Sequence, residues 1–399
     1  MAGRVVIAGG GIAGMSTASA LRAGGFDGEV TLVDSGEFPH DRPPLSKEFL
    51  KGDKDIKAIA LQPEQWYDDQ SIRLIPRTSV ALLRPDAGAV ELSDGTGLPA
   101  DRVVLATGGR AARPPLPGAD GPRVHVVRVA DDAARLRAEL VPGARVLVVG
   151  AGLIGAEVAS TALGLGCEVL LADPVSPPLA AVLGAEIADW LHGVHVRRGV
   201  TVLEQGVRSF VDRVDGVEAR FADGGSRVVD VVVLGVGMTP ETSLAEAAGL
   251  EVDRGIVVDT RQVTSNPAVL AVGDPARVRG VSRAGHWEAA QDDGRRAAAT
   301  ILGHDAPGER APWFWTDRHG LHVEAVGEMD RAARTVLRGH MGEAAFSTFG
   351  LADGHVVAAV AVNDSTAVRA ARRMIDRRIT VDAERLADPA TDLRELLRG

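Results

Sequence analysis

Residues 5–14 read VVIAGGGIAG, a short apolar run that passes directly into a GxGxxG motif. An Ala- and Leu-rich stretch typical of a helix follows, and a second apolar run ends at Asp34, 20 residues after Gly14. Gly9 permits a tight turn, Gly11 lets the backbone approach a pyrophosphate, and Gly14 permits close packing of helix on strand. The pattern predicts a dinucleotide-binding βαβ unit in which Asp34 holds ribose hydroxyls.

A second unit of the same kind begins at residue 145. Residues 145–155 read RVLVVGAGLIG, and the apolar run after the next helical pattern ends at Asp173, 18 residues past Gly155. A carboxylate there accepts hydrogen bonds from an adenosine 2′-hydroxyl but repels a 2′-phosphate, and residues 174–179 contain no arginine to neutralise one. The sequence therefore favours NADH over NADPH.

Two dinucleotide units imply two dinucleotides, and the pair that suits hydride transfer is a flavin and a nicotinamide. Two further apolar runs end in glycine, at Ala106-Thr107-Gly108 and at Gly273-Asp274. Gly273 would let the backbone approach a cofactor and Asp274 would hold a polyol hydroxyl, although both turns are equally typical of plain strand ends. The Pro- and Gly-rich stretches 113–118 and 235–240 are interpreted as crossings between domains.

Composition narrows the function further. The 399 residues exceed what one hydrophobic core usually serves, and the formal net charge of −10 disfavours nucleic acid or an anionic membrane as partner. The first strand-like run begins at Arg4 and no long apolar run follows, so we expect a soluble, cytoplasmic protein. Cys167 is the only cysteine, which excludes a CxxC pair and is most consistent with a packed structural thiol.

The chain resembles the FAD-dependent ferredoxin and rubredoxin reductases of oxygenase and cytochrome P450 systems, within the glutathione-reductase-like flavoproteins. Both glycine motifs, RPPLSK at 42–47, ATGG at 106–109 and PWFWTD at 312–317 carry the resemblance, which runs nearly end to end. It implies an α/β fold with two Rossmann-like dinucleotide-binding domains and a C-terminal α+β domain. The expected boundaries are 1–112 and 238–309 for the discontinuous FAD-binding domain, 113–237 for the NAD-binding domain and 310–399 for the C-terminal domain.

The resemblance also implies the reaction. NADH gives hydride to N5 of a bound FAD, and single electrons pass to a [2Fe-2S] ferredoxin or rubredoxin that feeds an oxygenase or cytochrome P450. Lys47 is expected beside the flavin N5 and paired with Glu157, while Trp287 and Trp315 are expected at the flavin. Alternatives are an NADH oxidase or monodehydroascorbate-type reductase on the same scaffold, and a flavin-bound NADH sensor.

The expected catalytic residues are Lys47, Glu157 and Trp315. The residues expected to contact a cofactor are Gly9, Gly11, Ile12, Ala13, Gly14, Asp34, Glu37, Arg42, Lys47, Ala106, Thr107, Gly108, Gly150, Gly152, Leu153, Ile154, Gly155, Asp173, Gly237, Gly273, Asp274, Trp287 and Trp315. Glu37 is included because the loop before RPPLSK is one residue shorter than is common, so it could share or replace the ribose role of Asp34. No cofactor contact is assigned to residues 291–294, where acids replace the usual Glu-Gln pair.

An acidic ferredoxin would need a positive landing zone, although arginine runs on helices are usually solvated faces. The candidate docking residues are Arg310, Arg369, Arg372, Arg373, Arg377 and Arg378. A monomer or weak homodimer is expected. The histidine pairs 192/195 and 319/322 have a spacing that could bind a metal, but no supporting cysteine or carboxylate pattern surrounds them, and we expect no metal site.

Overall fold

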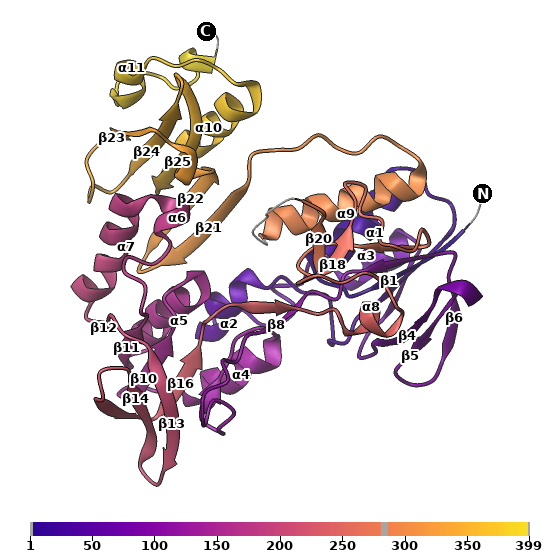
Figure 1. Ribbon diagram of the computed structural model, residues 1–399, viewed down its shortest axis with the longest axis horizontal. Helices are drawn as coiled ribbons and strands as arrows, with labels where there is room; N and C mark the ends of the chain where they lie inside the picture. Colours follow the sequence, from indigo (N-terminus) through magenta and orange to yellow (C-terminus); the bar gives the residue numbers. More distant parts are fainter. Residues whose placement is uncertain (1–2, 281–285, 398–399) are drawn as a thin grey trace. The chain divides into compact units, whose positions relative to one another are not determined.

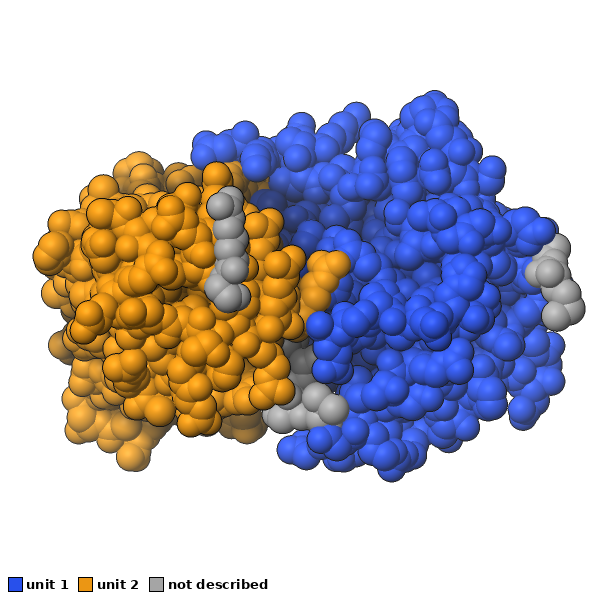
Figure 2. Space-filling view, turned by 90° about the horizontal axis from the view of Figure 1, so that it is seen from above, with its two compact units in different colours: residues 1–44, 52–110, 238–309 blue, residues 45–51, 111–237, 310–399 orange. Residues whose placement is uncertain are grey.

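The computed structural model describes residues 3–280 and 286–397, and Figure 2 colours its two units separately. Unit 1 comprises residues 1–44, 52–110 and 238–309. Unit 2 comprises residues 45–51, 111–237 and 310–399. Each unit is built on a five-stranded parallel sheet, and the C-terminal part of unit 2 is a five-stranded antiparallel sheet, so the predicted α/β class with a C-terminal α+β region is confirmed.

Unit 1 is built on five parallel strands in the order β19-β7-β1-β2-β3. They are β1 Arg4–Ala8, β2 Glu29–Val33, β3 Ile72–Ile75, β7 Arg102–Leu105 and β19 Val269–Ala271. In β1, Val5 and Ile7 enter the core formed with α1 and α9, whereas Val6 and Ala8 enter the core on the opposite face. Because both faces are covered, these strands are continuous apolar runs rather than alternating ones.

Helices α1 (Ile12–Ala23) and α9 (Trp287–Leu302) pack against each other on one face of this sheet (Figure 1). Gly294 permits this, because a Cβ there would lie 2.4 Å from the carbonyl oxygen of Ala13. The smaller elements of unit 1 are α3 Glu64–Asp69, α8 Ser243–Ala247, β4 Val80–Arg84, β5 Ala89–Leu92, β6 Gly97–Pro99, β18 Ile256–Val258, β20 Ala276–Val278 and η2 Pro85–Ala87. The chain leaves and re-enters the unit near the paired strands β8 Gly109–Ala111 and β17 Met238–Pro240.

Unit 2 repeats the parallel design in the order β12-β11-β10-β16-β9. These strands are β9 Val124–His125, β10 Arg145–Val149, β11 Glu168–Ala172, β12 Thr201–Leu203 and β16 Val231–Leu234. The helices of this part are α4 Ala130–Glu139, α5 Leu153–Gly164, α6 Ala180–Leu183 and α7 Ala185–Arg198. An antiparallel sheet of β13 Val207–Arg213, β14 Gly216–Phe221 and β15 Ser226–Val229 adds Phe210, Phe221 and Val229 to its core.

The C-terminal part of unit 2 is an antiparallel sheet in the order β21-β22-β25-β24-β23. It consists of β21 Trp313–Arg318, β22 Leu321–Gly327, β23 Arg334–Arg338, β24 Phe346–Ala352 and β25 His355–Val362, with η3 Met329–Arg331, α10 Ser365–Arg377, α11 Ala383–Ala387 and η4 Glu395–Leu397. Phe349 and Ala359 pack against α10, whereas Val323 and Val360 pack against Ile187 and its neighbours on α6 and α7. Figure 1 shows α10 and α6 beside the strands of this sheet. The sheet is therefore buried on both faces.

This second core explains why residues 111–237 and the C-terminal residues form one unit. Leu183 and Leu191 of the helices after β11 are fully buried against the C-terminal sheet. The segment 45–51, which the sequence assigned to the FAD-binding domain, also belongs to unit 2, because Ser46 bonds to Glu157 and Thr161 of α5. It contains the end of η1 (Pro43–Ser46) and α2 (Glu48–Lys51).

Across residues 3–280 and 286–397, none of the helices combines the length and the apolar character needed to cross a bilayer.

Candidate active site

The first glycine motif forms a turn that only glycine can make at the end of β1. Gly9 has φ +114°, and a Cβ there would lie 2.2 Å from the carbonyl oxygen of Ala106. Gly11 is the N-cap of α1 and has no side chain with which to cap the first amides. The amides of Ile12 and Ala13 therefore point out of the helix N-terminus, where a phosphate would receive them.

Asp34 lies against this turn. Its Oδ2 accepts a hydrogen bond of 2.7 Å from the amide of Gly10, and its Oδ1 accepts one of 2.6 Å from Gly36. Glu37 instead pairs with Arg77 at 2.5 Å and leaves 65% of its side chain exposed. Of the two acids considered for the ribose, Asp34 is the one that the structure places at the glycine motif.

The other expected cofactor contacts of unit 1 gather at the same edge of the sheet. Residues 106–108 follow β7 and residues 273–274 follow β19, and both strands run parallel to β1. The Nη1 of Arg42 lies 3.8 Å from Oδ2 of Asp274. A Cβ on Gly11 would lie 3.7 Å from Nη2 of the same arginine. Arg42 and Asp274 thus meet beside the glycine motif.

Two side chains fix the loops around this edge. The hydroxyl of Thr107 donates to the carbonyl of Glu241 at 2.8 Å. The indole N–H of Trp287, the first residue of α9, donates to the carboxylate of Asp41 at 2.7 Å. Trp287 belongs to unit 1, whereas Trp315 belongs to β21 of unit 2.

Asp293 is a buried carboxylate that the sequence analysis left without a role. Its Oδ2 accepts a hydrogen bond of 3.1 Å from the amide of Gly273, and its Oδ1 accepts one of 3.0 Å from Gln262. Gly273 itself has φ +74°. Asp293 therefore holds the turn that precedes Asp274.

The second glycine motif repeats the arrangement in unit 2. Gly150 has φ +95°, and a Cβ there would lie 2.5 Å from the carbonyl oxygen of Gly235. Gly152 is the N-cap of α5, so Leu153 and Ile154 offer the first amides of the helix, with Gly155 in its first turn. This terminus has the same capacity for a pyrophosphate as that of α1.

Asp173 occupies the position in unit 2 that corresponds to Asp34. Its Oδ2 accepts from the amide of Ala151 at 2.7 Å, and its Oδ1 accepts from Val175 at 2.8 Å. Gly237 follows β16, the neighbour of β10, with φ +111°. The acid, the glycine motif and Gly237 thus all follow the ends of adjacent parallel strands.

Lys47 is a buried cation held by two carboxylates from distant parts of the sequence. Its Nζ lies 2.8 Å from Oδ2 of Asp317 on β21 and 3.6 Å from Oε1 of Glu157 on α5. The Lys47–Glu157 pair that the resemblance implied is present, but Asp317 is the closer partner. Glu157 is held by the hydroxyl of Ser46, which donates to Oε2 at 2.5 Å, and by that of Thr316, which donates to Oε1 at 2.8 Å.

The charges of this cluster reinforce one another. Burial opposes the charge on Lys47, but the nearby charges of Glu157 and Asp317 outweigh it and raise the pKa of Lys47. Burial also opposes the charge on Asp317, yet its hydrogen bonds and ion pairs lower the pKa of that carboxyl. Burial raises the pKa of Glu157. The two acids therefore favour the charged form of Lys47, and Lys47 favours the charged form of Asp317.

Trp315 contributes its ring to the same cluster. The Nζ of Lys47 lies 5.6 Å from the centroid of the Trp315 ring, within the range of a cation–π contact. Trp313 stacks on Trp315 with centroids 5.0 Å apart and an interplanar angle of 24°. The three expected catalytic residues, Lys47, Glu157 and Trp315, are thus brought together within unit 2.

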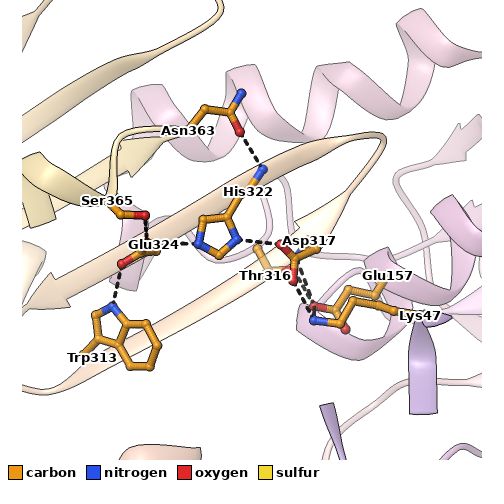
Figure 3. Close-up of polar contacts among 9 residues, drawn as sticks. All are labelled: Lys47, Glu157, Trp313, Thr316, Asp317, His322, Glu324, Asn363 and Ser365. Carbon is orange, nitrogen blue, oxygen red and sulfur yellow. Dashed lines mark hydrogen bonds and ion pairs between the residues drawn. The ribbon is translucent and has the colours of Figure 1, made fainter. Parts of the chain in front are cut away.

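Beyond Asp317 the polar contacts continue to His322 and Glu324, as Figure 3 shows. The sequence motifs predict no metal site at His322 and no role for Asp317 or Glu324. The alternation of side chains along a strand is the signal that points to Asp317, since Trp313, Trp315 and Asp317 share one face of β21. The other histidines pair differently, with His319 bonding to His195 at 2.8 Å.

Comparison with known proteins decides the family. Residues 3–294 match the family model described as pyridine nucleotide-disulphide oxidoreductase, and residues 313–397 match the model described as reductase C-terminal. The chain belongs to the pyridine nucleotide-disulphide oxidoreductase family.

Relatives within this family are named as ferredoxin reductases. The ferredoxin–NAD(+) reductase subunit of the benzene 1,2-dioxygenase system of Pseudomonas putida is 36% identical over 405 residues, covering 100% of this chain and 98% of that protein. The corresponding component of the anthranilate 1,2-dioxygenase system of Burkholderia cepacia is 38% identical over 404 residues, covering 98% of each. The resemblance that the sequence motifs indicated is confirmed.

A solved structure of a reductase is also similar to this chain. The covalent putidaredoxin reductase–putidaredoxin complex matches this chain with a TM-score of 0.92 at 33% identity, covering 99% of this chain and 98% of that one.

Despite the family's name, this member has one cysteine, Cys167, which lies outside the lysine cluster. It is buried just before β11, and its thiol lies 3.5 Å from the carbonyl oxygen of Val141. Burial raises the pKa of this thiol, which disfavours the reactive thiolate. Cys167 is therefore a packed structural group.

The candidate docking arginines lie in the C-terminal part of unit 2. Arg369, Arg373 and Arg377 are exposed at successive i, i+4 positions of α10, and Arg378 ends that helix. Arg372 is only half-exposed and donates to the carbonyl of Ala311. Arg310 is exposed before β21. We call Arg369, Arg373 and Arg377 the arginine ridge.

Proposed function

We propose that this chain is an FAD-dependent NADH:ferredoxin reductase. NADH delivers hydride to a bound FAD, and single electrons then pass to an iron-sulfur ferredoxin or rubredoxin that supplies an oxygenase or a cytochrome P450. The observation that carries the proposal is the combination, in one chain, of two glycine-motif helix termini with a buried lysine cluster and no cysteine beside it. The names of the relatives, which are ferredoxin reductases of dioxygenase systems, support the same activity.

The residues of unit 1 fit FAD. The N-terminus of α1, which has no side-chain cap, follows Gly9 and Gly11 and would bind a pyrophosphate. Asp34 lies at the same turn and would accept hydrogen bonds from ribose hydroxyls. Arg42 and Asp274 lie beside the motif and would hold the rest of the dinucleotide. FAD supplies the chemistry that converts a two-electron hydride donor into two single-electron steps.

The residues of unit 2 fit NADH. The N-terminus of α5 would bind the second pyrophosphate, and Asp173 would accept hydrogen bonds from the adenosine ribose. Both carboxylate oxygens of Asp173 already accept backbone amides, so the side chain is fixed in place. A fixed carboxylate repels a 2′-phosphate, and we infer a preference for NADH over NADPH.

Lys47 has the role of a fixed positive charge at the reacting centre. From the resemblance we infer that Lys47 lies beside the reactive edge of the flavin, where it would stabilise the negative charge that arrives with the hydride. Asp317 and Glu157 keep the ammonium protonated and in one orientation. The ring of Trp315 gives the ammonium of Lys47 a cation–π contact in the same cluster.

The arginine ridge is the docking surface we propose for the acidic ferredoxin. Its guanidinium groups stand one helical turn apart and exposed, so they present one row of positive charge on a chain of net charge −10. Such a row would steer an acidic partner toward this part of unit 2.

Anaerobic stopped-flow spectroscopy of the flavin-loaded protein tests the function. Mixing with NADH should bleach the flavin absorbance in one rapid phase, and mixing the reduced protein with a ferredoxin and cytochrome c should reduce the cytochrome only when the ferredoxin is present. Slow reoxidation by every iron-sulfur acceptor, or a purified protein that neither carries nor takes up flavin, would rule the proposal out.

A further inference from the structure

One face of the β21–β22 hairpin carries five polar and aromatic side chains that contact one another in series. Because side chains alternate along a strand, Trp313, Trp315 and Asp317 share a face of β21. The register pairs Asp317 with His322 and Trp315 with Glu324 across the two strands. Figure 3 shows the contacts that run from Lys47 through Asp317, His322 and Glu324 to Ser365, the first residue of α10.

His322 stands between two carboxylates. Its Nδ1 lies 2.6 Å from Oδ1 of Asp317, and its Nε2 lies 2.9 Å from Oε1 of Glu324. A neutral imidazole carries one N–H and can donate to only one of them, whereas an imidazolium donates to both. Burial opposes the charged ring, but hydrogen bonds and attraction from the two carboxylates outweigh it and raise the pKa of His322.

The end of this contact series farther from Lys47 is fixed. Glu324 is buried and accepts hydrogen bonds from the indole N–H of Trp313, at 3.0 Å, and from the hydroxyl of Ser365. The backbone amide of His322 donates to Oδ1 of Asn363 at 2.9 Å. Because these contacts hold the His322 imidazole in place, the imidazole determines where Oδ1 of Asp317 lies. The position of Oδ1 in turn determines where Oδ2 of Asp317 meets the ammonium of Lys47.

We propose that His322 is a positioning residue for the hydride-transfer step, which acts by holding Asp317, and through it the ammonium of Lys47, in place. The inference rests on the proposed function, in which Lys47 stabilises the charge that arrives with the hydride. It adds a residue that contacts neither cofactor nor Lys47 directly. Among the described residues the groups that face its ring or backbone are Asp317 from β21, Glu324 from β22, and the uncharged Asn363 that follows β25.

The proposal has a definite pH dependence. When the pH rises through the raised pKa of His322, the ring loses one N–H, and a lone pair then faces a carboxylate at hydrogen-bond distance. The ring is then held by one carboxylate instead of two, so Asp317 is positioned less firmly beside Lys47, whose other acid is the more distant Glu157. The rate of hydride transfer should therefore be high below this pKa and fall above it.

The test compares His322→Gln with a matched control, His340→Gln. His340 also contacts a carboxylate, Glu343, at 3.1 Å, but its side chain is 84% exposed and lies outside the series of contacts from Lys47 to Glu324. The rate of flavin reduction by NADH is measured anaerobically from below the ordinary histidine pKa to well above it, so that the raised pKa of His322 lies within the range. NADH affinity and flavin content are measured for each variant, so that a binding defect is separated from a slower step.

In the wild type we expect the rate to fall about ten-fold as His322 loses its proton, which corresponds to about 1.4 kcal/mol. His322→Gln should lack this inflection and should react at low pH about as slowly as the wild type does at high pH. His340→Gln should follow the wild-type profile. If His322→Gln keeps both the rate and the inflection, the proposal is wrong.

Nuclear magnetic resonance gives a readout that does not depend on activity. Only four lysines are present, so the ¹⁵N signal of the Lys47 ammonium can be assigned with Lys47→Gln. Replacing His322 should shift or broaden that signal and leave the other three unchanged, and the His322 ring should titrate above the ordinary histidine pKa. An unmoved Lys47 signal would overturn the positioning role. If the protein bound no FAD, the proposed function would fail, yet these two signals would still decide whether His322 controls Lys47.

Discussion

The ammonium of Lys47 lies 2.8 Å from the carboxylate of Asp317, a residue 270 positions further along the chain. Glu157, at 3.6 Å, completes a cluster of one cation and two acids. Lys47 and Glu157 are buried, so each stays in place only because the other charges compensate for its lost hydration. Several consequences of this cluster and of the two glycine motifs can be measured.

Replacing Lys47 with Gln should leave two carboxylates facing each other without a cation. We expect a loss of about 1–3 kcal/mol of unfolding free energy, less than for a fully buried pair because 40% of the Asp317 side chain is exposed. Hydride transfer should slow by roughly 10- to 100-fold, since a fixed charge at the reacting centre is lost. Thermal unfolding and stopped-flow reduction measure the two effects. Lys51→Gln, exposed on α2, is the control, and equal effects from both variants would contradict the assignment.

Asp173→Asn should relax the choice of nicotinamide cofactor. The amide keeps one oxygen for the backbone but loses the negative charge, so the preference for NADH over NADPH should fall roughly ten-fold, or about 1.4 kcal/mol. Initial rates with each cofactor measure the ratio. Asp34→Asn makes the same change at the first motif, where it should weaken FAD retention and leave the ratio unaltered. An altered ratio in Asp34→Asn would mean that the two sites are assigned the wrong way round.

Asp293→Ala should loosen the turn that carries Asp274. It removes the acceptor for the amide of Gly273 and leaves buried donors unpaired, at a cost of about 1–3 kcal/mol. We expect faster loss of flavin on dilution together with a lower Tm. Asp292→Ala changes the neighbouring acid, which forms only a local ion pair with Arg295, and should do neither. Flavin retention equal to wild type in Asp293→Ala would remove its role at the cofactor edge.

Cys167→Ser should leave the reaction unchanged within about two-fold, because a buried thiol with a raised pKa supplies almost no thiolate at neutral pH. Steady-state NADH oxidation with a ferredoxin and cytochrome c is the measurement. Loss of most activity while flavin and NADH still bind would overturn the cysteine-free account.

Arg373→Glu, in the middle of the arginine ridge, should raise the KM for ferredoxin and flatten its dependence on salt, because the steering charge is reversed. Reduction of the flavin by NADH should stay as in the wild type. Arg227→Glu places the same change at an exposed position of β15 and should leave both quantities unaltered. Unchanged acceptor kinetics in Arg373→Glu would exclude the ridge as the docking surface.

Much of this site was predictable because its determinants are local. The turn at Gly9 and the acid at Asp34 are set by a few consecutive residues and a fixed spacing, and the structure places Asp34 on the motif. Family resemblance placed Lys47 with Glu157, but the closer acid, Asp317, stood unassigned inside the PWFWTD segment. The pairing of Asp317 with His322 depends on the register between β21 and β22, and the sequence of neither strand alone specifies that register.

The sequence by itself determined that this chain has two dinucleotide-binding βαβ units, since glycine spacing, apolar runs and a terminal acid act within some thirty residues each. Only the tertiary structure decided that the helices after β11 and the C-terminal sheet share one core. It also decided that Asp293 holds Gly273 and that His322 holds Asp317. These contacts join residues whose pairing depends on how whole sheets and helices pack, and the free energy that fixes them comes from burial that no local pattern contains.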